Sequence, residues 1–175
     1  MLLRLLLWAG LMLGSASAAI AQTRAMPTEI TPRPNQAANS AAITAATNSR
    51  IVLSLNQRRL YLYRSDMLVS SYPVAVGTAE TPTPQGQFAV SQMIVNPAWQ
   101  SPWTGEVHPP GPESALGLRW IEFASNQEGS FGFHGTPTLD SIGQAASNGC
   151  VRMRNEDVVA LFAQIGVGTV VAVQP

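Results

Sequence analysis

The stretch FHGTPTLDSIGQAASNGCVRM, residues 133–153, decides how the folded part of this chain is organised. It holds Cys150, which is the only cysteine among 175 residues, His134, which is one of two histidines, and Arg152. Residues 131–134 predict a short strand that ends on the histidine, and residues 147–149 predict a turn just before the cysteine. If the chain loops back between them, the imidazole and the thiol meet across neighbouring strands.

A thiol, an imidazole and a guanidinium are the groups that a covalent acyl transfer needs. The thiolate is the nucleophile in cysteine chemistry, so a catalytic cysteine needs a base or a positive charge nearby. The amides of Asn148, Gly149 and Cys150 in the turn can supply an oxyanion hole. The alternative is purely structural, with Cys150 as a small buried residue and His134 as a hydrogen-bonded core histidine.

Residues 1–21 predict an export signal. Arg4 precedes an apolar run, and Ala19-Ile20-Ala21 offers a cleavage site before Gln22. An uncleaved membrane anchor is the alternative, although the run is shorter than the ~20 residues that span a bilayer. The protein is therefore expected in the periplasm or the cell wall. Exported proteins usually pair their cysteines, so the lone Cys150 is a buried residue, an intermolecular link or a reactive thiol.

The remainder of the chain divides into a linker and one domain. Residues 22–49 are rich in Ala, Thr, Asn and Pro and lack aromatic residues, which predicts a flexible linker. The folded domain is expected over residues 50–175. Only 11% of all residues are charged and the formal net charge is zero, so nothing indicates a nucleic-acid partner.

This domain is predicted to be mostly β. Alternating and β-branched residues predict strands at 51–55, 59–64, 68–76, 87–94, 118–123, 131–134 and 168–173. One helix is expected over residues 155–165, with Asn155 as its N-cap. The proline-rich residues 95–114, which include Trp99 and His108, predict a long loop that binds substrate or acts as a lid.

Three motifs resemble the YkuD-type L,D-transpeptidase catalytic domain. Residues 134–153 resemble its pattern HGT … SIG … S-H-G-C-[IV]-R-[ML]. Residues 83–88, TPQGQF, resemble its T-P-x-G-x-F loop, and residues 116–121, LGLRWI, resemble its L-G-x-R-W-[IL] strand. The resemblance covers about residues 50–174 and implies a β-sandwich-like fold with one or two short helices.

The resemblance also implies a role for each site residue. Cys150 would be the nucleophile, and His134 would be first its base and then the acid for the leaving group. The Gly135 carbonyl would orient the imidazole, and the backbone at Asn148 and Gly149 would stabilise the oxyanion. The residues implied in substrate binding are Arg152, Ser147, Thr136 and Trp120. The family pattern has histidine where this chain has Asn148, so no proton transfer is expected from that side chain.

The substrate that the resemblance implies is a stem tetrapeptide of peptidoglycan, in cell-wall synthesis and the maintenance of cell shape. The chain would release the terminal D-alanine and pass the remaining acyl group to a neighbouring stem as a 3→3 cross-link. Carbapenem-type inhibitors are expected to react with Cys150, and no cofactor or metal is expected. Three alternatives stay open: an L,D-carboxypeptidase-type hydrolase, a sortase-like ligase and a non-catalytic cell-wall-binding module.

Overall fold

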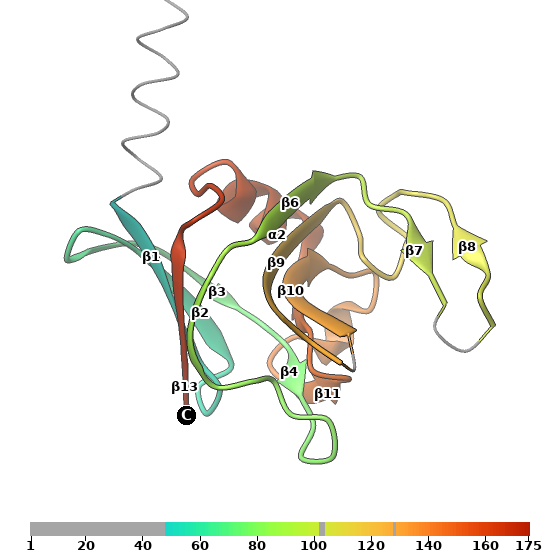
Figure 1. Cartoon of the computed structure of the whole chain (residues 1–175), viewed down its shortest axis with the longest axis horizontal. Helices are drawn as coiled ribbons and strands as arrows, with labels where there is room; N and C mark the ends of the chain where they lie inside the picture. The colour runs from blue at the N-terminus through green and yellow to red at the C-terminus, as the bar shows by residue number, and fades with distance from the viewer. Residues whose placement is uncertain (1–47, 102–103, 128) are drawn as a thin grey trace, which may run out of the picture. The chain divides into compact units, whose positions relative to one another are not determined.

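The computed structural model describes residues 48–101, 104–127 and 129–175. The predicted export signal and all but the last two residues of the predicted linker lie outside these residues. Two β-sheets and the helix α2, Asn155–Phe162, make up the main frame of the described residues (Figure 1). No helix in the described part of the chain is long and apolar enough to cross a membrane.

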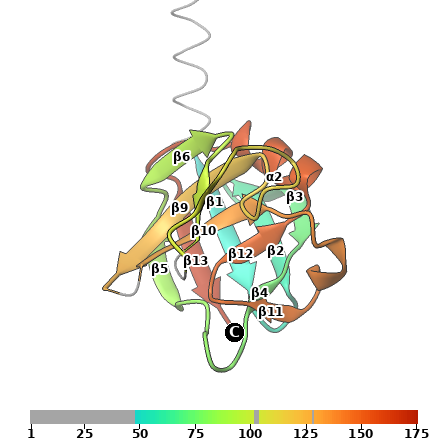
Figure 2. The same cartoon turned by 90° about the vertical axis from the view of Figure 1, so that its right-hand side faces the viewer.

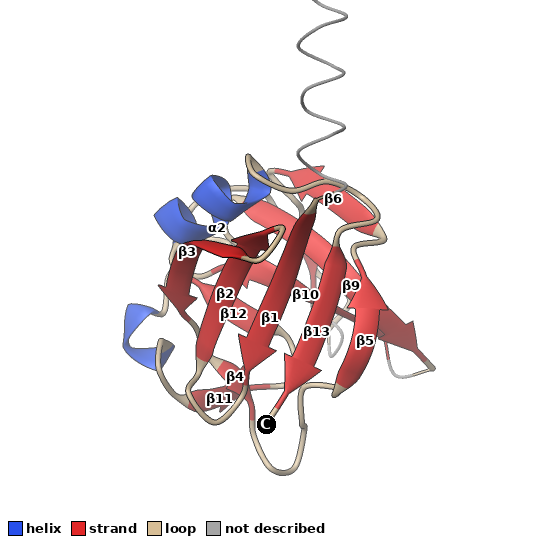
Figure 3. Cartoon of the chain, turned by 90° about the vertical axis from the view of Figure 1, so that its left-hand side faces the viewer, coloured by secondary structure: helices blue, strands red, loops and turns tan. Residues whose placement is uncertain are grey.

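The first sheet has five strands, in the order β3-β2-β1-β13-β5 (Figure 3). Its central strand β1 pairs in parallel with β13, and the other pairs are antiparallel. Alternate side chains of β1, β2 and β13 are buried because a strand presents every second residue to the core. The strand bounds are β1 Ser49–Ser54, β2 Arg59–Arg64, β3 Met67–Pro73, β5 Gly86–Ala89 and β13 Val170–Gln174.

The second sheet has four strands, in the order β12-β10-β9-β6 (Figure 2). The strand β10 pairs in parallel with β12 and antiparallel with β9. Phe133, Ile121 and Val151 are fully buried on one face, so their neighbours His134, Trp120 and Arg152 lie on the other face. The strand bounds are β6 Gln92–Val95, β9 Arg119–Asn126, β10 Gly129–Gly135 and β12 Val151–Met153.

A single apolar core holds residues of both sheets and of α2. Phe123 lies between Phe88 and Phe133, with ring centroids 5.6 Å and 4.9 Å away. The helix buries Val158 and Leu161 completely. The prediction of a mostly β domain is confirmed, and this core holds the four-stranded sheet in place beneath the site.

The structure corrects the predicted connections. The third strand ends at Pro73, and Val76–Gly77 forms the separate strand β4, which pairs with β11, Ala145–Ser147. The long loop contains a two-stranded hairpin of β7, Trp99–Gln100, and β8, Val107–His108. A 3₁₀ turn, η1, spans Leu139–Ser141. These short strands were missed because two or three residues carry too little periodicity to be recognised.

The predicted N-cap of the helix was wrong. Arg154 occupies the N-cap position and makes no side-chain capping bond, and the helix ends at Phe162 rather than at residue 165. The side chain of Asn155 is engaged elsewhere, because its Oδ1 accepts the amide of Leu118 at 3.0 Å and its Nδ2 donates to the carbonyl of Pro112 at 3.1 Å. Asn155 therefore fastens the long loop beside the site.

Candidate active site

The pairing of β10 with β12 brings the predicted site residues together. His134 pairs with Arg152 on one side and with Trp120 of β9 on the other. Cys150 directly precedes β12 and lies two residues before Arg152, so both side chains are on the face of the sheet that carries His134. All four residues line one cavity of about 590 Å³, which we call the thiol cavity.

His134 is held in one tautomer by its own neighbour in the chain. Its Nδ1 lies 2.7 Å from the carbonyl oxygen of Gly135, and since a carbonyl can only accept, Nδ1 carries the proton. Nε2 is then the unprotonated acceptor of the ring. The Gly135 carbonyl, which was predicted to orient the imidazole, therefore accepts a direct hydrogen bond from it.

Burial lowers the pKa of His134 to about 4. The cost of burying the charged ring is the largest cause, and the positive charge of Arg152 acts in the same direction, while the bond to Gly135 opposes both. Only 5% of the residue is exposed. At neutral pH the imidazole is therefore uncharged and able to accept a proton.

Burial also raises the pKa of the Cys150 thiol. A backbone hydrogen bond from Gly132 and the charge of Arg152 oppose this shift without cancelling it. The thiol donates weakly to the carbonyl of Ser130 at 3.6 Å. The resting pair is thus a neutral thiol and a neutral imidazole, and attack on a carbonyl requires proton transfer to His134 in the same step.

The turn before Cys150 is ordered by Ser147. This residue is 2% exposed, and its hydroxyl accepts the amide of Gly149 at 3.2 Å and donates to the carbonyl of Cys150. Because the Gly149 amide is engaged inside the turn, the amides of Asn148 and Cys150 remain as the candidates for the predicted oxyanion hole. Ser147 acts on the shape of the turn, in addition to lining the thiol cavity.

Glycine is required at position 149 for two reasons. Its φ of +101° is a conformation that other residues rarely adopt. A Cβ at this position would also lie 2.6 Å from Cε1 of Phe131. The turn can therefore lead into Cys150 in this geometry only with glycine at position 149.

Thr83, the first residue of the second motif, supports the same turn from 66 residues upstream. Its hydroxyl accepts the amide of Gly77 at 2.9 Å and donates to the carbonyl of Gly149 at 2.9 Å. Thr81 adds a bond to the carbonyl of Ser147 at 3.0 Å. Sequence reasoning quoted this motif but gave Thr83 no role, and its only local signal is a threonine in a Pro-rich loop.

Replacing Thr83 with valine should destabilise the protein by about 1–3 kcal/mol, because the Gly149 carbonyl and the Gly77 amide lose their partner. Urea unfolding at neutral pH would measure the change. Thr83→Ser keeps the hydroxyl and should recover most of the stability. Equal unfolding midpoints for wild type and Thr83→Val would show that these two bonds contribute nothing.

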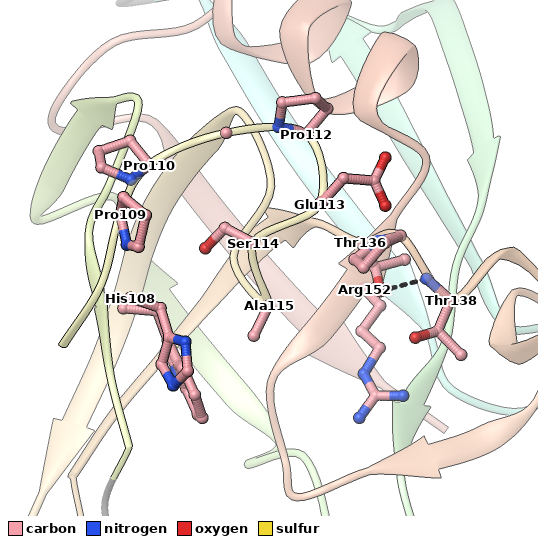
Figure 4. Close-up of a pocket in the computed structure, with 13 residues that line it drawn as sticks. His108, Pro109, Pro110, Pro112, Glu113, Ser114, Ala115, Thr136, Thr138 and Arg152 are labelled. Atoms are coloured by element: carbon pink, nitrogen blue, oxygen red, sulfur yellow. Dashed lines mark hydrogen bonds between the residues drawn. The ribbon is translucent and has the colours of Figure 1, made fainter. Parts of the chain in front are cut away.

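Arg152 carries a positive charge at the junction of two cavities. It lines the thiol cavity and a second cavity of about 630 Å³, the loop cavity, which residues 108–115 and 136–138 also line (Figure 4). The ion pairs found in the described ranges are Arg50–Asp66 and His108–Glu106, and neither involves Arg152. The guanidinium is thus placed to bind an anionic group of a ligand.

The other predicted site residues shape the walls. Trp120 is 8% exposed, and its ring centroid lies 6.0 Å from that of His134, so the indole supports the imidazole. Thr136 lines the loop cavity, and its hydroxyl accepts the amide of Thr138 at 3.2 Å (Figure 4). Trp99 of the hairpin lines both cavities and packs on His108, with ring centroids 5.0 Å apart.

Comparison with known proteins identifies this arrangement. Residues 48–173 match the L,D-transpeptidase catalytic domain. The chain belongs to this family. It is 40% identical over 126 residues to a putative L,D-transpeptidase, YkuD, of Bacillus licheniformis, a match that covers 72% of this chain and 66% of the relative. Family membership leaves no support for the sortase-like alternative.

Two solved L,D-transpeptidases share the fold. One is from Mycobacterium tuberculosis, with a TM-score of 0.59 and 20% identity over 73% of this chain and 58% of that one. The other was solved in complex with imipenem, with a TM-score of 0.57 and 20% identity over 73% of this chain and 59% of that one. The chain spans less than two thirds of each of these L,D-transpeptidases.

Proposed function

We propose that this chain is an L,D-transpeptidase that joins stem peptides of peptidoglycan through an acyl-enzyme on Cys150. One observation carries the proposal. The Gly135 carbonyl commits Nδ1 of His134 as a donor, which leaves Nε2 as a neutral base in the cavity that holds the thiol. The family of the chain supports the same chemistry.

In the first half of the reaction, the thiol proton moves to Nε2 as sulfur attacks the carbonyl of the third residue of a stem tetrapeptide. The amides of Asn148 and Cys150 would stabilise the oxyanion. The bond to the terminal D-alanine then breaks, and His134 returns its proton to the leaving amine. The product is a thioester and free D-alanine.

In the second half, an amine of a neighbouring stem attacks the thioester carbonyl. The amine gives a proton to His134, the carbon–sulfur bond breaks, and the proton passes to sulfur to restore the thiol. The product is a 3→3 cross-link. Arg152 would hold a carboxylate of the donor stem, with Thr136, Ser147 and Trp120 forming the walls around it.

Peptidoglycan lies outside the cytoplasmic membrane, so the enzyme must be exported to meet its substrate. Residues 1–21 are proposed as the signal that directs this, and residues 22–49 as the linker to the domain. The protein would then act in the periplasm or at the cell wall.

Incubation of the intact protein with a carbapenem such as imipenem should add the mass of one inhibitor molecule. The expected site is Cys150, since it is the only cysteine in the chain. Peptide mapping of the adduct would verify the position. If the wild type takes up no carbapenem and forms no acyl-enzyme with a stem tetrapeptide, the transpeptidase proposal fails and the cell-wall-binding module becomes the better interpretation.

A further inference from the structure

The thiol cavity continues into a third cavity, which lies at the start of β10, whereas the loop cavity lies past the end of that strand. This third cavity, of about 590 Å³, is lined by Glu80 and shares Gly129, Ser130 and Asn148 with the thiol cavity. We call it the Glu80 cavity. The loop cavity instead joins the thiol cavity through Trp99, Ala115 and Arg152.

The two outer cavities are well separated along the strand. Residues 129–131 line the Glu80 cavity, and residues 136–138, just past the end of β10, line the loop cavity. Six residues of extended chain span ~20 Å. Cys150 directly precedes β12, the strand that pairs with β10, and lies between these two ends, so a ligand could approach the thiol from either side.

The charge changes sign along this path. Among the described residues that line the Glu80 cavity, Glu80 is the only charged one. Backbone and Thr78 hydrogen bonds lower the pKa of its carboxyl, so it is ionised at neutral pH. Arg152 is the cation shared by the thiol and loop cavities, whereas Glu113 and His108 of the loop cavity do not line the thiol cavity.

We propose that the Glu80 cavity is the subsite that receives the acceptor amine in the second half of the reaction. The inference rests on the proposed function, which requires two substrates at one thiol. The donor ends in a carboxylate, which the positive charge of Arg152 attracts. The acceptor arrives as an ammonium ion, which the negative charge of Glu80 attracts.

Asn148 lies at the junction of the two cavities, where the acceptor amine would reach the thioester. It lines both the Glu80 cavity and the thiol cavity, and it is exposed. After losing one proton to solvent, the amine attacks the thioester carbonyl, and a second proton passes through His134 to the departing sulfur. An asparagine side chain takes no proton, so it can accept a hydrogen bond from the amine without competing with His134.

The test measures how the acyl-enzyme divides between amine and water. The full-length protein is given a stem tetrapeptide as donor and D-alaninamide, which has an ammonium and no carboxylate, as acceptor. Mass spectrometry quantifies the aminolysis and hydrolysis products. Both come from the same acyl-enzyme, so their ratio does not depend on how fast that intermediate forms.

Glu80→Gln should lower the ratio of aminolysis to hydrolysis about two- to fivefold at low salt, the range expected for one exposed charge pair. Asp66→Asn is the matched control, because Asp66 is also an exposed carboxylate and lies in the turn after β2, on the five-stranded sheet. It should leave the ratio unchanged. Raising the salt to about 1 M should bring the wild type to the ratio of Glu80→Gln, since salt screens exposed charges.

Three results would overturn the inference: an unchanged ratio in Glu80→Gln, an equal fall in Asp66→Asn, or a fall in Glu80→Gln that persists at high salt. Each of these requires an acyl-enzyme to form, so each leaves the proposed function standing. If no acyl-enzyme forms with either the tetrapeptide or imipenem, both the proposed function and the acceptor subsite are wrong.

Discussion

Cys150→Ala should form no acyl-enzyme, and cross-linking should fall by about 10⁴-fold or more, the scale seen when a covalent nucleophile is removed. The described residues place no second thiol in the cavity, and the sequence holds none elsewhere. Intact-protein mass after incubation with imipenem, together with the rate of D-alanine release, would measure the loss.

The same variant should remain folded. The Cys150 side chain is partly buried, and the hydrogen bond that it donates, to the carbonyl of Ser130, is weak. Its far-UV circular dichroism and thermal midpoint should stay close to those of the wild type. An imipenem adduct on Cys150→Ala would assign the nucleophile to another residue, whereas an unfolded variant would require Cys150→Ser as the replacement test.

His134→Ala should slow acylation about 10²- to 10⁴-fold, the range for loss of a general base. Because the pKa of His134 is about 4, the wild-type acylation rate should stay level from about pH 7 down to pH 5 and fall only near pH 4. A histidine of ordinary pKa would already lose activity near pH 6.5. Stopped-flow acylation by imipenem across this range would distinguish the two.

The depressed pKa also makes stability depend on pH. Below pH 6.5 the unfolded chain binds a proton at this histidine that the folded protein does not, so stability is complete above pH 6.5 and falls as the pH drops towards 4. The full effect is about 3 kcal/mol, from 2.5 pH units at 1.36 kcal/mol each. Urea unfolding at several pH values should show this slope, and His134→Ala should reduce it.

The acylation prediction has its own contrary outcome. An unchanged acylation rate in His134→Ala would remove the residue from the role of base.

The local sequence was sufficient to predict an element wherever its pattern of apolar and polar residues repeats over several positions. Alternation predicted the long strands, and the rarity of cysteine and histidine directed attention to Cys150 and His134. The helix was predicted from its apolar spacing, but its N-cap was not. A cap and a loop anchor both use asparagine, and only the position of Leu118 decides which of these Asn155 becomes.

The sequence by itself determined the chemical groups, their order and a mostly β frame, because these depend on residue identity and short-range periodicity. The tertiary structure alone decided how the groups meet. The parallel register of β10 and β12 places His134 beside Arg152, and Thr83 holds the carbonyl of Gly149 across 66 residues. Such contacts join segments far apart in the chain, and their hydrogen-bonding groups find partners only when the sheets have packed. For the same reason, the engaged amide of Gly149 and the three joined cavities could be seen only in the folded chain.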